Sequence, residues 1–307
     1  MVLTEPGLSV VVDAMLIARG VFQRMLSFLT YRVAATLQLV FFFFIGVFAL
    51  PLENYGIIDD KFKFFQLPVL MFMLITLLND GTLMCIGYDN VVPSVRPQRW
   101  NLPVLFCISA VLAAVACASS LLLLWMAADS IGNYDQSWFH GLGITKVRPG
   151  QIVSMIYLKV SISDFLTLFS ARTQDKFFWS NMPSAVLLCG ALISLAISTI
   201  VAIFWPDTSP DDINTMGLVR GDGNTNLLPI WVWLYCIFWW FVQDVIKVLA
   251  YKLLERFDIF HYRTIALGHY KPKAKKGKTH HHHPDDGPEP FVASPIAVTS
   301  SPQHHPH

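Results

Sequence analysis

The stretch "MFMLITLLNDGTLMCIGYDN", residues 71–90, is apolar enough to cross a membrane, yet it holds Asn79, Asp80 and Gly81 in its middle. A membrane-spanning helix needs about 20 mostly apolar residues. A carboxylate at its centre costs roughly 2.5–3.5 kcal/mol on insertion scales, and a glycine beside it weakens the helix. The stretch therefore predicts a transmembrane helix whose polar interruption has a functional use.

The composition agrees with a membrane protein. The chain has 307 residues, of which 54% are hydrophobic and only 14% are charged, whereas a soluble domain has about 25% charged residues. The net charge is +1, which gives no reason to expect a nucleic-acid partner. The five cysteines lie in apolar runs without metal-ligand or disulfide spacing, so we expect neither a metal site nor a disulfide framework.

Six apolar runs are long enough to span a bilayer, and they predict an all-α integral membrane protein with a six-helix transmembrane bundle. Their approximate limits are 29–50, 66–87, 102–127, 151–171, 183–205 and 228–250. The fourth run is the weakest because it contains Lys159 and Asp164.

The chain is expected to have three parts. Apolar residues recur every three or four positions over residues 9–28 and no helix breaker follows, so one continuous helix is predicted from about 9 to 49, on the order of 60 Å long. Residues 1–28 would form a cytoplasmic stalk, and residues 29–252 the six-span domain. Residues 253–307 would form a cytoplasmic, mostly disordered tail, because they are basic and then rich in His and Pro.

Lysine and arginine residues are more frequent on one side of the predicted spans. If the N-terminus is cytoplasmic, the inside segments carry most of them, including Arg19, Arg24 and Arg32, which follows the positive-inside rule. Both termini are then cytoplasmic, and the outside loops are roughly 51–65, 128–150 and 206–227. The chain is expected to be a multi-pass protein of the plasma membrane.

Five motifs occur in one order with apolar runs between them. They are "VLTEPGLS" (2–9), "FQRM" (22–25), "LLNDGTLM" (77–84), "YDNVVPSVRPQRWNLP" (88–103) and "WLYCIFWWFVQDVIKV" (233–248). With these motifs, residues 2 to 255 resemble the C-terminal membrane half of the P-type plasma-membrane proton ATPases of plants, fungi and protists. The resemblance implies that the six spans match family helices five to ten.

The catalytic signatures of that family are missing from these 307 residues. The "DKTGT" and "TGES" sequences are absent, and "GDGNTN" at 221–226 is interpreted as a turn-rich loop. The chain is therefore expected to be a fragment, an incomplete gene model or a truncated paralogue. It should have no catalytic residue of its own and should not hydrolyse ATP alone, so ATP and Mg²⁺ are expected only for the full-length pump.

The resemblance implies that Asp80 matches the family's membrane carboxylate, which binds and releases the transported proton. Low dielectric disfavours the charged form of a carboxyl group, which agrees with that role. Asn79 and Gly81 would let the helix unwind locally, so that freed carbonyl groups line a polar cavity. The alternative is a structural Asp80 that caps a broken helix.

Three further residues are candidates for the ion pathway. In plant relatives an Arg on the preceding helix faces the carboxylate, and Gln38 aligns with it but cannot supply a positive charge. Gln38 lies on the ion path or is a plain interhelical hydrogen-bonding residue. Lys159 and Asp164 are five residues apart, about 140° around a helix, so each should find its partner on another span, in a structural or a pathway role.

Two other charged residues, Asp244 and Lys247, are three apart, which predicts a structural ion pair within one helix.

The leading hypothesis is the transport domain of an ATP-driven proton pump that exports protons through a membrane carboxylate. Its partners would be the lipid bilayer, protons and the missing N-terminal half of the pump. The alternatives are a passive six-span channel or carrier, and an inert remnant or non-transporting subunit.

Overall fold

The computed structural model describes seven segments, which all fall within one compact unit, Met1–His269. They are residues 8–49, 65–91, 100–132, 138–141, 147–206, 215–219 and 227–259. The tail beyond residue 259 and the "GDGNTN" stretch lie outside the described residues, as do residues 51–64, 133–137, 142–146 and 207–214 of the loops expected outside.

Every regular element in these segments is helical, and six helices are long and apolar enough to cross a membrane. They are α1 (Leu8–Ala49), α2 (Val69–Met84), α3 (Leu102–Gly132), α5 (Pro149–Ala171), α6 (Ala185–Phe204) and α7 (Leu228–Arg256). Shorter helices are η2 (Cys85–Tyr88), α4 (Trp138–Gly141) and η4 (Phe178–Ser180). The predicted fold class, an all-α membrane protein with six spans, is confirmed.

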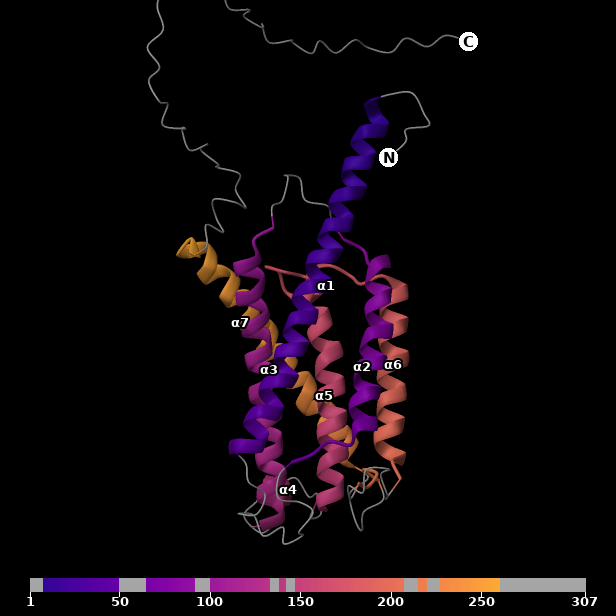
Figure 1. Ribbon diagram of the computed structural model, residues 1–307, viewed down its shortest axis with the longest axis vertical. Helices are drawn as coiled ribbons and strands as arrows, with labels where there is room; N and C mark the ends of the chain where they lie inside the picture. Colours follow the sequence, from indigo (N-terminus) through magenta and orange to yellow (C-terminus); the bar gives the residue numbers. More distant parts are fainter. Residues whose placement is uncertain are drawn as a thin grey trace, which may run out of the picture. The chain divides into compact units, whose positions relative to one another are not determined.

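Helix α1 is continuous over 42 residues. Its N-terminal part extends past the ends of the other helices (Figure 1). Large apolar side chains are exposed along that part, among them Val12, Met15 and Ile17. The stalk and the first span are therefore one rigid element, and any displacement of the stalk is carried directly into the membrane region.

Helix α5 lies at the centre of the bundle, in contact with α1, α2, α3, α6 and α7. In its most apolar window 89% of the residues are buried, against 28% in α6. The polar groups of α5 explain this position, since Lys159, Asp164 and several Ser and Thr residues would each be costly in contact with lipid. Surrounding α5 with five helices removes these groups from the hydrocarbon and supplies hydrogen-bond partners.

A buried ion pair ties three elements together just beyond the end of α2. Arg172, at the end of α5, donates from Nε and Nη2 to the two carboxylate oxygens of Asp89 at 2.8 and 2.9 Å. Both side chains are about 2% exposed. The Ser184 backbone N–H, just before α6, also donates to Asp89 at 3.1 Å. The bidentate pair thus joins the ends of η2 and α5 to the start of α6.

Replacement of Arg172 by Met should strongly destabilise the bundle, because it leaves the buried Asp89 carboxylate without its cation. The expected loss is about 3–5 kcal/mol in the free energy of unfolding, measured by denaturant titration in detergent micelles. Arg256→Met removes an exposed arginine at the end of α7 and should change stability by less than about 0.5 kcal/mol. Equal stability of the two variants would contradict this account.

Candidate functional site

The Asp80 carboxylate lies on α2 and forms an ion pair with the Arg32 guanidinium of α1. Their side chains are 49% and 46% exposed, so the pair sits on the outer surface of the bundle. Both residues belong to helices of membrane-spanning length. Charged residues within membrane spans normally face other protein or a water-filled cavity. A half-exposed ion pair on the surface of the bundle is therefore expected where further protein completes the site.

The expected unwinding at Asn79–Gly81 does not occur: α2 continues through these residues and tightens into the 3₁₀ helix η2 only at Cys85. The reason lies in the side chains. Asp80 is neutralised by Arg32, and Asn79 donates to Asp164, so neither side chain competes for the helix backbone. The prediction of a broken helix lined by free carbonyl groups was wrong for this structure.

The partner expected for Asp80 on α1 was also misplaced. Arg32, and not Gln38, contacts the carboxylate. Six residues separate the two side chains, which places them about 120° apart around α1, so they point to different faces. Arg32 is the one charged residue of the predicted span 29–50, and this alone was a signal for a functional partner inside the membrane.

A second polar group lies on the inner side of α2. The Asn79 Nδ2 atom donates to Asp164 Oδ2 on α5 at 2.9 Å, and both side chains are buried. Gln38 of α1 is also buried and lies next to the Asp164 carboxylate. The structure thus brings together three of the predicted pathway residues, from three helices, on the face of α2 next to the one that carries Asp80.

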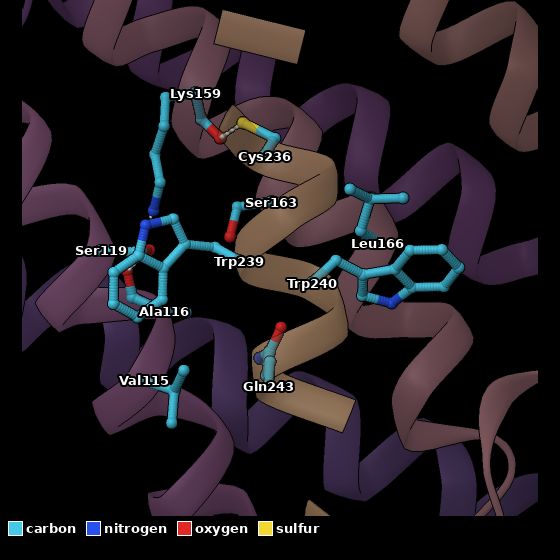
Figure 2. Close-up of a pocket in the computed structure, with 10 residues that line it drawn as sticks. All are labelled: Val115, Ala116, Ser119, Lys159, Ser163, Leu166, Cys236, Trp239, Trp240 and Gln243. Carbon is cyan, nitrogen blue, oxygen red and sulfur yellow. Dashed lines mark hydrogen bonds between the residues drawn. The ribbon is translucent and has the colours of Figure 1, made fainter. Parts of the chain in front are cut away.

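Lys159 is fully buried and points to α3, away from these residues. Its Nζ atom donates to the Ala116 carbonyl at 2.9 Å and to the Ser120 hydroxyl. Beside it is a small cavity of about 10 Å³, room for about one water molecule. Figure 2 shows the Lys159 side chain extending toward Ala116 and Ser119, with Ser163 and Gln243 further along the cavity wall.

The two buried lysines differ in their partners. Lys247 contacts Asp244 Oδ1 at 2.7 Å within α7, which confirms the predicted ion pair, and it also donates to the Thr173 hydroxyl at 2.9 Å. Lys159 has only neutral oxygen partners in direct contact within the part of the chain that the structure describes. Lys247 therefore has a structural counter-ion, whereas Lys159 directly contacts only uncharged oxygen atoms in the described segments.

We predict opposite outcomes for the same change at the two lysines. Lys159→Met keeps the length of the side chain and removes a buried charge without orphaning a carboxylate, so stability should change by less than about 1.5 kcal/mol. Lys247→Met strands Asp244 in the interior and should cost about 3–5 kcal/mol. Denaturant titration of both variants in the same detergent tests this, and a larger loss for Lys159→Met would refute it.

Comparison with known proteins finds ATPases among the relatives of this chain. The chain is 61% identical over 263 residues to "Probable proton ATPase 1A" of Leishmania donovani, and equally so to "Probable proton ATPase 1B". It is 28% identical over 255 residues to "Probable plasma membrane ATPase" of Dictyostelium discoideum. These alignments cover 85% and 80% of the chain. No family model matches it.

The alignments cover 27% of the Leishmania proteins and 22% of the Dictyostelium protein, so the chain spans about a quarter of the length of its curated relatives. Within that quarter lie six helices of membrane-spanning length, with the polar residues Asp80, Asn79 and Asp164 among them. The chain is thus related to the P-type proton ATPases, and its six helices correspond to the membrane half of such a pump.

Proposed function

We propose that this chain is the transport region of an ATP-driven plasma-membrane proton pump, in which Asp80 binds and releases the exported proton. The observation that carries the proposal is the ion pair between Asp80 and Arg32, a carboxylate and a cation held by different helices within membrane spans. ATP, Mg²⁺ and the phosphorylated catalytic part would act on this region from outside the 307 residues. Both termini would be cytoplasmic.

Arg32 supplies the positive charge that Gln38 lacks. When the Asp80 carboxylate accepts a proton it becomes neutral, and its attraction to the Arg32 guanidinium largely disappears. The proton leaves when the guanidinium returns, because a nearby positive charge favours the ionised acid. Uptake and release of one proton are thus coupled to the distance between α1 and α2.

The continuous α1 helix offers a route for that coupling. Arg32 and the stalk belong to the same unbroken helix of 42 residues. A force applied to the stalk by a phosphorylated domain would therefore move Arg32 relative to Asp80 without any intervening hinge. In this proposal the energy of ATP changes the position of a cation, and the cation changes the proton affinity of the carboxylate.

The exposure of the pair supports the idea that further helices complete the site. About half of each charged side chain is exposed, although charged residues within membrane spans normally face protein or a water-filled cavity. Large apolar residues of α1 and α2, among them Phe41, Phe44 and Leu77, are also exposed. We propose that other membrane helices of the complete pump cover Asp80 and Arg32.

The test is a chimera in which this chain replaces the matched 263-residue region of the Leishmania relative, reconstituted in vesicles with ATP. Asp80→Asn keeps the size of the side chain but removes the titratable group, so proton uptake should stop while expression is retained. Asp80→Glu should keep partial transport, because the proton acceptor remains.

Glu255→Gln is the matched control, since it makes the same chemical change at an exposed position near the end of α7, and it should pump as the unmodified chimera does. Normal pumping by Asp80→Asn would contradict the proposal and leave Asp80 a structural role. Proton flux without ATP through the chain alone, lost in Asp80→Asn, would indicate a passive channel or carrier instead.

A further inference from the structure

Three buried polar atoms on side chains that meet at Asp164 have no hydrogen-bond partner in the part of the chain that the structure describes. They are Gln38 Nε2 on α1, Asn79 Oδ1 on α2 and Asp164 Oδ1 on α5. The three side chains are 1%, 6% and 0% exposed. Leaving a buried polar atom unpaired is costly, so three such atoms on neighbouring side chains indicate a missing ligand.

The orientation of the two amides follows from the charge between them. Asn79 must turn its Nδ2 toward Asp164 Oδ2, 2.9 Å away, because the amide oxygen would repel the carboxylate. Its Oδ1 is then left as an acceptor. Gln38 also lies next to Asp164, and its donor Nε2 has no hydrogen-bond partner among the described residues. The site therefore offers one donor and two acceptors.

A water molecule matches this set of groups. It can accept from Gln38 Nε2 while donating its two hydrogens to Asn79 Oδ1 and Asp164 Oδ1, which satisfies all three atoms at once. A metal cation does not match, because the free amide N–H of Gln38 is a donor and offers it no lone pair. The described residues also contain no group of three His, Cys, Asp or Glu side chains suited to a metal ion.

We propose that Gln38, Asn79 and Asp164 hold a bound water molecule, and that Asp164 with this water is a second proton-accepting site of the transport path. A proton that arrives from the aqueous phase is accepted by the oxygen of this water while the water passes one of its own protons to Asp164 Oδ1, so the water is unchanged and one proton has moved from solution to the carboxylate. The inference rests on the proposed proton transport, and it places a second carboxylate next to Asp80 across α2.

The position of Asn79 links the two sites. Asn79 and Asp80 are consecutive on an unbroken helix, with Asn79 facing α5 and Asp80 facing Arg32 of α1. A rotation of α2 that moves one therefore moves the other. The titratable groups that act on Asp164 are Lys159 on its own helix and Tyr31 on α1, which also interacts with Asp80.

Infrared difference spectroscopy of the whole chain in lipid nanodiscs, stepped between low and high pH, tests the inference. We expect two carboxyl bands that appear on protonation, one lost in Asp80→Asn and the other lost in Asp164→Asn. We also expect a bound-water band that shifts when H₂¹⁸O replaces ordinary water. Gln38→Met should abolish the water band and shift the Asp164 band only.

The matched control is Gln243→Met, which changes another buried glutamine that contacts α5 through Thr167 and should leave the water band in place. The water site would be overturned if the unmodified chain shows no ¹⁸O-sensitive band. It would also be overturned if Gln243→Met abolishes this band while Gln38→Met retains it. An Asp164 band that never titrates would overturn the second proton site while leaving Asp80 intact. Titration of Asp164 without Asp80 would instead refute the proposed role of Asp80.

If Gln38→Met does not fold, Asp164→Asn takes its place, since it keeps the shape of the side chain. Loss of one carboxyl band in this variant supports proton binding by Asp164, and persistence of both bands contradicts it.

Discussion

The polar groups of α5 must be kept out of the hydrocarbon and given hydrogen-bond partners, and the arrangement of the other five membrane helices follows from this requirement. Lys159 is satisfied by α3, Asp164 Oδ2 by Asn79 of α2, and Ser170 by Asp244 of α7. Each polar residue of α5 thus selects a neighbour. Helices in lipid gain little free energy from apolar contact with one another. The polar contacts therefore favour this arrangement of the helices over other arrangements.

The consecutive residues Asn79 and Asp80 show how one helix serves two sites. A step of one residue turns a side chain by about 100° around the axis. Asn79 therefore points into the bundle toward Asp164, whereas Asp80 points to Arg32 on the outer surface. If Asp80 is the proton carrier, as proposed, its chemistry is mechanically joined to that of the interior through a rigid helix, without the unwound segment that its sequence suggested.

The sequence was sufficient to predict the number of spans and the unbroken α1, because these depend on apolar length and on the absence of helix breakers. It did not reveal the partners inside the bundle. Arg32 was counted as a charge that sets membrane orientation, and Gln38 was aligned with a relative's arginine, because a linear pattern does not say which faces of two helices meet. The unwinding at Gly81 failed as a prediction for a related reason, since partners on α1 and α5 satisfy the polar side chains that would otherwise disturb the backbone.

The most direct test of the central position of α5 is a scan of spin labels in lipid nanodiscs. Residues 152–170 of α5 and 186–204 of α6 are replaced one at a time by Cys in a background without the five native cysteines, and the collision rate of each label with oxygen dissolved in the bilayer is measured. The account predicts uniformly low rates along α5 and a strong oscillation with a period of about 3.6 residues along α6. A similar oscillation along α5 would show that one face of it meets lipid, and would contradict the account.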